Sequence, residues 1–245
     1  MSDDWFTKDR SETASNRAKN RSIGTISVIN PALGVNVYQK ALTDSQCQSY
    51  IETLESHLNG QTQYSWRGAY VTTSDEVDLE SRNAKDFKFN SFGLGPKSPE
   101  NQKLYQMHEE IFQKVRMCVD DYGAYWGVGI RAYEAFNFVK YEGAGTHFRI
   151  HADHGPTYVS TVSIVVYLND DYVGGELWFP RLDNLKIKPS AGDIVVFPST
   201  YIYEHASEEM IEGTKYSVVI MSDYNDRDGV NNKVSQTVTE YKLTY

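Results

Sequence analysis

The second half of the chain is a series of short strand-like runs, and this series most constrains the fold. The run from Thr161 to Leu168 (TVSIVVYL) is almost entirely apolar and largely β-branched, as in a strand buried on both faces. An aromatic run precedes it at 133–141, and further runs follow at 176–179, 194–197 and 216–221. Because turns rich in Gly and Pro separate these runs at short intervals, the pattern favours a β-sandwich or barrel.

Four polar residues stand at the ends of these runs. His151 and Asp153 form a His-X-Asp pair, His205 follows the run at 194–197, and Lys215 comes directly before the last run. Two imidazoles and one carboxylate can hold an Fe(II) ion by one face and leave its other positions open. A lysine is a point cation on a long stem, which suits a buried carboxylate. The pattern therefore predicts a metal site with an anion-binding lysine beside it.

The sequence around these residues resembles a known enzyme family. The matching residues are Tyr141, Gly145 and Phe148 before the His-X-Asp pair, then Tyr167-Leu168-Asn169, Gly174 to Pro180 (GGELWFP), Gly192-Asp193, Phe197-Pro198, and Gly213 to Tyr216 (GTKY). From about 136 to 224 the chain is similar to the prolyl 4-hydroxylase branch of the iron(II)/2-oxoglutarate-dependent dioxygenases. The resemblance implies a mainly β fold with flanking helices: a double-stranded β-helix (jelly-roll) core at about 130–224, with supporting N-terminal helices.

The resemblance also implies an activity and its cofactors. Such enzymes hydroxylate a substrate while 2-oxoglutarate is decarboxylated to succinate and CO2, using Fe(2+) and O2, with ascorbate as an optional stimulant. Carried over to this chain, His151, Asp153 and His205 would bind the metal. Lys215 and Tyr141 would bind the co-substrate.

The substrate residues depart from the family pattern. Phe148, Ser160, Trp178 and Met221 are expected to line the substrate pocket. Members of the branch that act on peptides usually carry tyrosine, arginine and tryptophan where this chain has Phe148, Ser160 and Met221. The residues expected to bind metal and co-substrate thus match the family better than those that would bind a peptide. Peptidyl proline remains one candidate substrate, and a different small molecule or side chain is the alternative.

Two other functions are compatible with parts of the pattern. A jelly-roll module that binds metal or ligand without turnover would keep the fold, although the three ligands and Lys215 are all present. A Zn(II) hydrolase could use the same ligands, but it needs a general base beside the open site, where this sequence provides a cation. The oxygenase interpretation is favoured over both.

The first half of the chain is expected to supply the supporting helices. Thr43 and Gln46 form a capping box that predicts a helix ending at Asn59-Gly60. Its apolar stripe comprises Cys47, Ile51, Leu54 and Leu58. Apolar residues at helical spacing predict a second, long helix at 102–122. The segment 61–99 reads as irregular, with Trp66 and Arg82 as candidates for a loop over the substrate entrance.

Composition bounds the rest of the interpretation. The 245 residues are 40% hydrophobic, enough for one large core, so we expect a flexible polar arm at 1–25 and a single domain at 26–245. The net charge of −9 disfavours nucleic acid as a partner, and the partner expected is a peptide or small-molecule substrate. No apolar run reaches membrane-spanning length and the N-terminus has no signal core, so a soluble, intracellular (cytoplasmic) protein is expected.

The remaining histidines and cysteines are expected to have structural roles. His147 and His154 flank the His-X-Asp pair without the spacing of a third ligand, so each is assigned to a solvated loop or to support of the site. His57 and His108 are expected to face solvent on the two helices. The two cysteines of the chain, Cys47 and Cys118, are expected to be small core residues without a disulfide. Nothing in the sequence indicates an oligomeric state.

Overall fold

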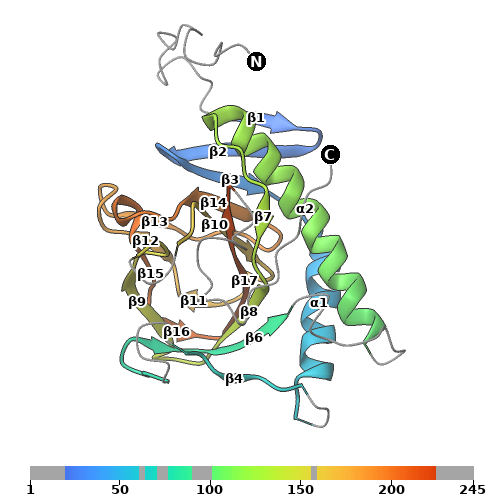
Figure 1. Ribbon diagram of the computed structural model, residues 1–245. Coiled ribbons are helices and arrows are strands. Elements are labelled where there is room, and N and C mark those ends of the chain that lie inside the picture. Colours follow the sequence, from blue (N-terminus) through green and yellow to red (C-terminus); the bar gives the residue numbers. More distant parts are fainter. Residues whose placement is uncertain (1–19, 61–63, 71–76, 90–100, 156–158, 225–245) are drawn as a thin grey trace, which may run out of the picture.

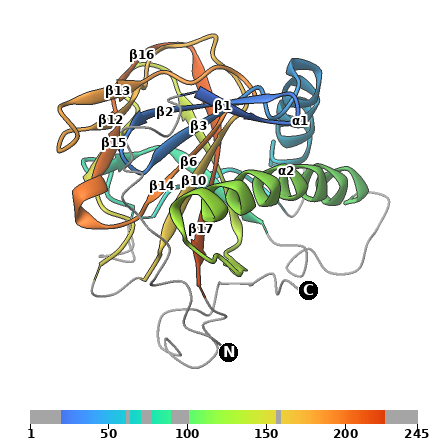
Figure 2. The same cartoon turned by 90° about the horizontal axis from the view of Figure 1, so that it is seen from above.

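Three layers make up the protein: two helices, a large sheet and a smaller sheet (Figures 1 and 2). The computed structural model describes residues 20–60, 64–70, 77–89, 101–155 and 159–224. Both views place α1 and α2 on one side of the large sheet and the small sheet on the other. The mainly β, jelly-roll architecture expected from the strand-like runs is confirmed.

The large sheet is antiparallel and runs in the order β1-β2-β3-β14-β10-β17-β8-β6-β4, with β7 paired to β17. Its strands are β1 (Asn20–Ile23), β2 (Ile26–Ala32), β3 (Val35–Gln39), β4 (Arg67–Gly68), β6 (Lys85–Phe89), β7 (Ala132–Tyr133), β8 (Phe136–Glu142), β10 (Val162–Tyr167), β14 (Ile194–Pro198) and β17 (Thr214–Asp223). Strand β10 lies between β14 and β17, and all six of its residues are buried. The continuous apolar run at this position therefore does form a strand covered on both faces.

The small sheet carries the residues predicted to bind metal. It runs in the order β13-β12-β15-β9-β5, and a separate ribbon pairs β11 with β16. The strands are β5 (Arg82–Asn83), β9 (His147–His151), β12 (Leu177–Phe179), β13 (Leu185–Ile187) and β15 (His205–Ser207), with β11 (Val173–Gly174) and β16 (Met210–Glu212) in the ribbon. A short 3-10 helix, η1 (Tyr201–Tyr203), leads into β15.

Both helices begin and end where the sequence predicts them, within one turn. Helix α1 (Asp44–His57) has Thr43 as its N-cap and the complete capping box with Gln46. Helix α2 (Gln102–Trp126) continues one turn beyond the predicted end and stops at Gly127, whose φ of 75° is the left-handed conformation that glycine adopts without strain. The described residues form no helix long and apolar enough to cross a membrane.

Side chains of the large sheet alternate between two cores. On the outer face, Ile164 of β10, Val218 of β17 and Phe138 of β8 pack against the helices in one large cluster. On the inner face, Val165 of β10 joins a cluster with Phe179 of the small sheet. Because the side-chain period of a strand is two, a residue's place in this alternation decides whether it faces the helices or the predicted metal site.

Several expectations about the first half of the chain need correction. The segment 61–99 is not wholly irregular, because β6 pairs with β8 along its length and β5 pairs with β9. Strand β1 occupies part of the predicted arm at 1–25, so the arm can extend no further than residue 19. The strand-like tail predicted after Tyr224 lies outside the described residues. Edge strands such as β1 and β5 are short, and short polar strands carry little periodicity to detect.

His108 faces the core and not solvent, contrary to expectation. It lies on the inner side of α2, is 1% exposed, and its ring is 4.4 Å from the ring of Phe136 and 5.0 Å from that of Phe89. Burial lowers the pKa of His108 to about 4. His57 is half-buried, with Nδ1 2.8 Å from the carbonyl oxygen of Thr53. Cys47 and Cys118 are buried and free, as predicted.

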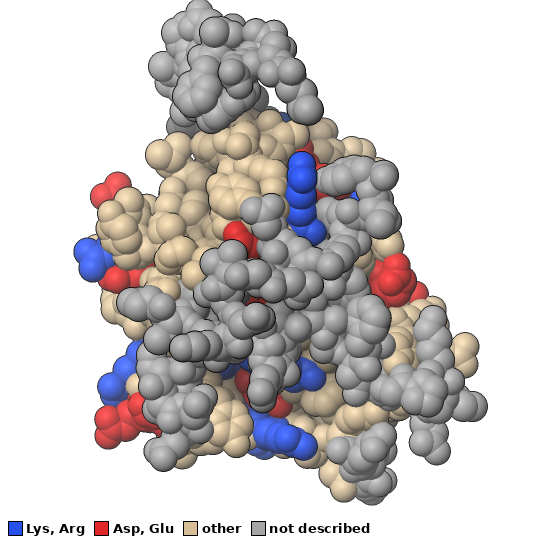
Figure 3. Space-filling view, viewed as in Figure 1, with Lys and Arg blue, Asp and Glu red and all other residues tan. Residues whose placement is uncertain are grey.

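The surface seen in Figure 3 carries charges of both signs. Lysine and arginine side chains lie among aspartate and glutamate side chains over the described part of this face. Two of the exposed ion pairs are Lys85 with Glu142 and Lys186 with Glu208, both at 2.6 Å.

Candidate metal centre

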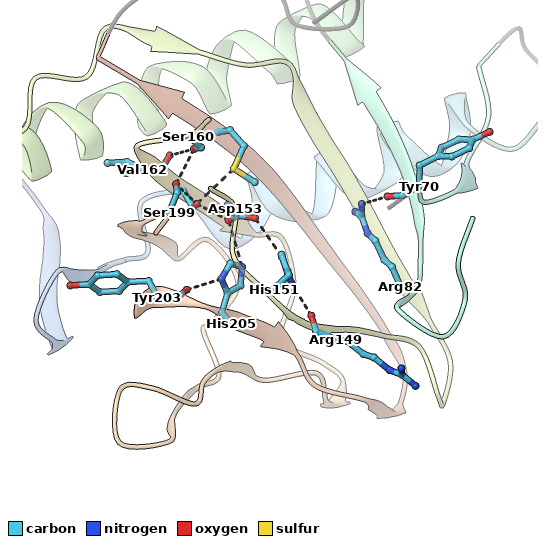
Figure 4. Close-up of polar contacts among 12 residues, drawn as sticks. Tyr70, Arg82, Arg149, His151, Asp153, Ser160, Val162, Ser199, Tyr203 and His205 are labelled. Atoms are coloured by element: carbon cyan, nitrogen blue, oxygen red, sulfur yellow. Dashed lines mark hydrogen bonds and ion pairs between the residues drawn. The ribbon is translucent and has the colours of Figure 1, made fainter. Parts of the chain in front are cut away.

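The structure brings His151, Asp153 and His205 together. His151 ends β9 and His205 begins β15, and the antiparallel register places the two histidines directly opposite each other. One ligand atom from each residue lies within 4.8 Å of the other two, which a single ion could bridge. The Nε2 atoms of His151 and His205 lie 3.4 and 3.6 Å from the two oxygens of Asp153 (Figure 4).

Backbone carbonyls hold both imidazoles in the tautomer that a metal needs. Nδ1 of His151 is 2.8 Å from the carbonyl oxygen of Arg149, and Nδ1 of His205 is 3.1 Å from that of Tyr203 (Figure 4). A carbonyl oxygen only accepts hydrogen bonds, so Nδ1 must be the protonated nitrogen in each ring. The Nε2 lone pairs therefore remain available toward the cluster.

Asp153 is buried and strongly stabilised as a carboxylate. Burial alone would raise its pKa, but the neighbouring imidazoles of His205 and His151 and the hydrogen bond from Ser163 lower the pKa overall. The Ser163 hydroxyl donates to Oδ2 at 2.6 Å. Burial lowers the pKa of His205 to about 4, which favours the neutral imidazole that binds metal ions.

Aromatic rings line the site on two sides. Phe148 stacks on the His151 ring, with centroids 3.6 Å apart and planes inclined by 22°. Phe197 and Phe179 lie 4.8 and 5.7 Å from the ring of His205. Phe148 is therefore next to the metal site, as its predicted place in the pocket requires.

Lys215 lies on the inner face of β17, buried to 2% exposure. Its ammonium group donates to the carbonyl oxygen of Gly175 at 2.7 Å and to the hydroxyl of Ser207. Burial lowers the pKa of Lys215 to about 7, since the nearby charge of Glu176 offsets only part of the desolvation. Among the described residues, no carboxylate forms an ion pair with this group. A buried cation in this state would be stabilised by an anion brought from outside the chain.

Tyr141 lies directly across from Lys215. The register of β8 and β17 pairs the two residues, and Nζ of Lys215 is 4.3 Å from the centroid of the Tyr141 ring. The Tyr141 hydroxyl is hydrogen-bonded with Ser207, and burial raises its pKa. Ser207 is two residues beyond His205 on β15 and therefore on the same face, about 6.6 Å along the strand. The predicted co-substrate residues thus lie close to the metal ligands.

Two of the four residues predicted for the substrate pocket, Ser160 and Trp178, do not line the space beside the candidate metal ligands. Ser160 is fully buried, and its hydroxyl lies 2.8 Å from that of Ser199 (Figure 4). Trp178 lies on the outer face of the small sheet, because its neighbours Leu177 and Phe179 point into the inner core, and Lys186 sits over its ring at 5.6 Å. The correction for Trp178 follows from strand alternation, which sequence alone did not orient, whereas Ser160 lies just before β10 and is buried by its contact with Ser199.

Met221, the fourth residue predicted for the pocket, lies beside the candidate metal ligands. Its sulfur is 3.7 Å from the hydroxyl of Ser163, the residue that donates to Asp153. The two strands pair Met221 with Ser163 directly. Met221 is half-buried on the inner face of β17.

The two loop candidates lie on opposite sides of the large sheet. Trp66 packs on the helix side, where its indole N–H donates to Glu55 of α1 at 3.1 Å, so it is a packing anchor and not an entrance residue. Arg82 lies on the site side, with its guanidinium 4.8 Å from the Phe148 ring centroid and Nη1 donating to the carbonyl oxygen of Tyr70 (Figure 4).

His147 and His154 are away from the cluster of ligand atoms, as predicted. Both ring nitrogens of His147 face carbonyl oxygens, those of Gly145 and Glu80, at 2.9 and 3.0 Å. Nδ1 of His154 is 2.8 Å from the carbonyl oxygen of Ser160. His147 thus ties β9 to the loop that precedes β5.

Sequence reasoning missed a group of polar residues on the inner face. Ser163 and Ser199 support Asp153, and Ser207 joins Lys215 to Tyr141. Asn137 hydrogen-bonds to Asp86, while its Oδ1 atom is buried without a partner among the described residues. A polar residue inside a buried strand was the only signal that could have identified Ser163 and Asn137.

The donor set fits Fe(II) and a dicarboxylate. Two imidazoles and one carboxylate whose ligand atoms lie close together suit a divalent first-row metal with open positions. The ammonium group of Lys215 donates to Ser207, on the strand that carries His205, and it suits the far carboxylate of a co-substrate that also reaches the metal. The chain's own residues therefore fit the two groups that the sequence implies.

Comparison with known proteins agrees with this geometry. Residues 136–221 match the family model of the 2OG-Fe(II) oxygenase superfamily. The chain is 36% identical over 81 residues to a PKHD-type hydroxylase of Prochlorococcus marinus, an alignment that covers 31% of this chain and 36% of the relative. The chain thus spans about a third of the length of this curated relative.

Solved structures share the fold. A Trichoplax adhaerens prolyl hydroxylase in complex with a peptide of hypoxia inducible factor superposes with a TM-score of 0.60 at 16% identity, covering 77% of this chain and 83% of that one. A viral collagen prolyl hydroxylase of Paramecium bursaria Chlorella virus-1 gives 0.54 at 18% identity over 79% and 97%. A Pseudomonas putida prolyl-4-hydroxylase gives 0.52 at 16% identity over 79% and 94%. Residues 136–221 therefore match the 2OG-Fe(II) oxygenase superfamily, and the fold of the chain is the one seen in prolyl hydroxylases.

Proposed function

We propose that this protein is an Fe(II)- and 2-oxoglutarate-dependent dioxygenase that hydroxylates its substrate. The observation that carries the proposal is the combination of a three-ligand metal site with a buried lysine that has no carboxylate partner among the described residues. Either feature alone would also suit a protein of another class, but together they match a co-substrate that binds metal at one end and a cation at the other. An intracellular, cytoplasmic location is part of this proposal, since Fe(II) and 2-oxoglutarate are available there.

The protein's part in the reaction is to bind and orient the metal and the co-substrate and to exclude water from the site. His151, Asp153 and His205 would hold the metal by one face, leaving the opposite face for ligands. When bound, Fe(II), 2-oxoglutarate and O2 supply the oxidation: the co-substrate is converted to succinate and CO2, and one oxygen atom enters a C–H bond of the substrate. Phe148 and Phe197 flank the two imidazoles with apolar rings, which strengthens the electrostatic interactions of the ligands by excluding water.

The co-substrate would lie between the metal ligands and Lys215. The ammonium group would bind the distal carboxylate, with the hydroxyls of Ser207 and Tyr141 beside it. A buried hydrogen bond between the ammonium group and this carboxylate would both strengthen co-substrate binding and fix the orientation of the co-substrate.

Two alternatives are weaker. A binding module without turnover has no need for all four residues, yet the structure brings all four to one side of the sheet. A Zn(II) hydrolase needs a general base next to the open face, whereas the group presented there is the Lys215 cation.

We propose a substrate other than the proline of a proline-rich peptide. The Trichoplax relative was solved with a peptide, and the viral relative is a collagen prolyl hydroxylase. Here Ser160 is fully buried and hydrogen-bonded to Ser199, and Phe148 and Met221 offer no strong hydrogen-bond donor. Asn137 presents a buried acceptor on the same inner face, which favours a substrate with an N–H or O–H group near the reacting carbon.

The test is turnover of 2-oxoglutarate without added substrate. Purified protein with Fe(II), ascorbate and O2 should release succinate slowly, and Asp153→Ala should abolish this release. Asp120→Ala, an exposed carboxylate on α2, is the matched control and should behave like the wild type. No succinate from a protein that binds Fe(II) would support the silent binding module, and hydrolysis of ester probes with Zn(II) would support the hydrolase.

A further inference from the structure

A chain of three serine hydroxyls ends on the metal-site carboxylate. Ser163 donates to Oδ2 of Asp153 at 2.6 Å, the hydroxyl of Ser199 lies 2.7 Å from that of Ser163, and the hydroxyl of Ser160 lies 2.8 Å from that of Ser199 (Figure 4). The exposed fractions of the three serines are 0, 1 and 0% for residues 163, 199 and 160. Burying a hydroxyl in a mainly apolar sheet costs free energy unless it forms a hydrogen bond, and each of these three hydroxyls forms one.

The direction of these hydrogen bonds follows from proton counting. An ionised carboxylate only accepts, so Ser163 must give Asp153 its single proton. Ser199 must then donate to Ser163, and Ser160 must donate to Ser199. Competing acceptors are weak or distant, since the Met221 sulfur is 3.7 Å from the Ser163 hydroxyl and the carbonyl oxygen of Val162 is 3.5 Å from that of Ser160. The chain is therefore unidirectional, and each donor polarises the next.

The same serines also fix the turn that follows Asp153. The backbone N–H of His154 donates to the carbonyl oxygen of Ser199 at 2.9 Å, and Nδ1 of His154 is 2.8 Å from the carbonyl oxygen of Ser160. The backbone N–H of Ser199 donates to the carbonyl oxygen of Thr161 at 3.1 Å. Ser160 and Ser199 thus hold both the side chain of the ligand and the backbone immediately after it.

We propose that Ser160 and Ser199 are positioning residues for the metal centre, acting through Ser163 to fix the rotation of the Asp153 carboxylate. This inference rests on the proposed function only in that it requires metal binding at the triad. A carboxylate held at one oxygen presents the other toward the metal in a single orientation. Partners beyond the direct ligands typically contribute about 10- to 100-fold to metal affinity. Ser160, at a position where peptide hydroxylases of this family carry an arginine, would thereby serve the metal and not the substrate.

Co(II) binding, followed by its visible absorption in the absence of co-substrate, tests the proposal independently of turnover. Ser199→Ala should weaken Co(II) binding by about tenfold. Ser160→Ala should weaken it by a smaller factor, because Ser160 is one hydrogen bond further from Asp153 than Ser199 is. Ser222→Ala is the matched control: Ser222 is equally buried in β17, and its hydroxyl donates to the carbonyl oxygen of Val162 at 2.8 Å, outside the chain of three serines. Its Co(II) affinity should equal that of the wild type.

A double-mutant cycle separates positioning from general loosening of the fold. If Ser160 acts through Ser163, the effect of Ser160→Ala on Co(II) affinity should vanish in a Ser163→Ala background. Additive effects, or an equal loss in Ser222→Ala, would overturn the proposal. Ser199→Thr keeps the hydroxyl and should restore affinity, and if Ser199→Ala does not fold, the cycle between Ser160 and Ser163 carries the test. A wild-type protein that binds no Co(II) at the triad would instead refute the proposed function.

Discussion

Phe148 and His151 are stacked, with ring centroids 3.6 Å apart and an interplanar angle of 22°. The two residues are on the same strand, three positions apart, and the guanidinium of Arg82 also lies 4.8 Å from the centroid of the Phe148 ring. The imidazole is thus held by an aromatic ring as well as by the carbonyl oxygen of Arg149. The stack limits rotation of the ring about its side-chain torsion and gives the first prediction.

Phe148→Leu should weaken metal binding while leaving the fold intact. Loss of an aromatic contact is worth about 0.5–1.5 kcal/mol, so Co(II) affinity should fall by a few-fold to about tenfold. Phe148→Tyr keeps the stacked ring and should bind like the wild type. Phe87→Leu, which removes a ring from the helix side of the sheet, is the control. Equal losses in Phe148→Leu and Phe87→Leu would show that the stack has no specific role.

Lys215→Ala should raise the 2-oxoglutarate requirement steeply. Removing one partner of a buried charge pair costs about 3–5 kcal/mol, which corresponds to a hundredfold to a thousandfold or more in co-substrate affinity. Metal affinity should change little, because no metal ligand touches the ammonium group, whose partners are Gly175 and Ser207. Calorimetric titration of the metal-loaded protein with 2-oxoglutarate measures the co-substrate affinity, and titration of the metal-free protein with Co(II) measures the metal affinity.

If Lys215→Ala leaves the requirement unchanged, another cation must hold the carboxylate. Arg149 and Arg181 are the candidates by sequence position. Arg149 is exposed on β9, and Arg181 is exposed and forms an ion pair with Glu204 at 2.9 Å. Neither is buried beside Tyr141, so neither is expected to replace Lys215.

Co-substrate binding should depend on pH above neutrality. The pKa of Lys215 is about 7 in the free protein, lowered by burial, and an adjoining carboxylate raises it. Binding therefore takes up a proton above pH 7, so affinity is full below this pH and falls as pH rises toward the pKa of the complex. Titrations in two buffers of different ionisation enthalpy measure the proton uptake. A Lys215→Met variant should show none, and pH-independent binding by the wild type would contradict the assignment.

His108 should make the fold sensitive to acid. Its pKa is about 4 in the folded protein because of burial, against about 6.5 when unfolded. The unfolded state binds more protons between these values, so this contribution is intact above pH 6.5 and is lost as pH falls toward 4, by about 3 kcal/mol at most. His108→Phe should unfold at a lower pH than the wild type. Denaturant titrations at pH 7 and pH 5 check this, and an equal pH dependence in both proteins would contradict it.

Proline-rich peptides should be poor substrates. With Ser160 buried and Phe148 and Met221 in place of hydrogen-bonding side chains, the site gives up interactions that peptide hydroxylases make with the reacting residue. Neither poly-proline nor a proline-glycine repeat peptide should stimulate succinate release in a saturable way. Mass spectrometry of the peptide checks the product, and rapid, saturable hydroxylation would restore the usual substrate of the family.

The sequence by itself indicated the candidate metal ligands, the lysine and most of the strands around them. Residue identity alone decides what His151, Asp153, His205 and Lys215 can bind, and the run at Val162–Tyr167 is apolar on both faces whatever its neighbours are. The capping box of α1 is likewise local, since its hydrogen bonds join residues three apart. Features of this kind can be recognised in the sequence because they do not depend on the register of distant strands.

Only the tertiary structure decided which way the remaining side chains face. Trp178 was predicted at the pocket, but a strand's pattern does not reveal which of its faces turns inward, and here the register turns Trp178 outward. Ser160 was also predicted there, but the segment before β10 is buried against Ser199. His108 is buried because α2 packs on the large sheet, where Phe89 of β6 and Phe136 of β8 contact its ring. The hydrogen bonds that hold Asp153 likewise join segments far apart in the sequence, and only the antiparallel pairing of β10 with β14 brings them together.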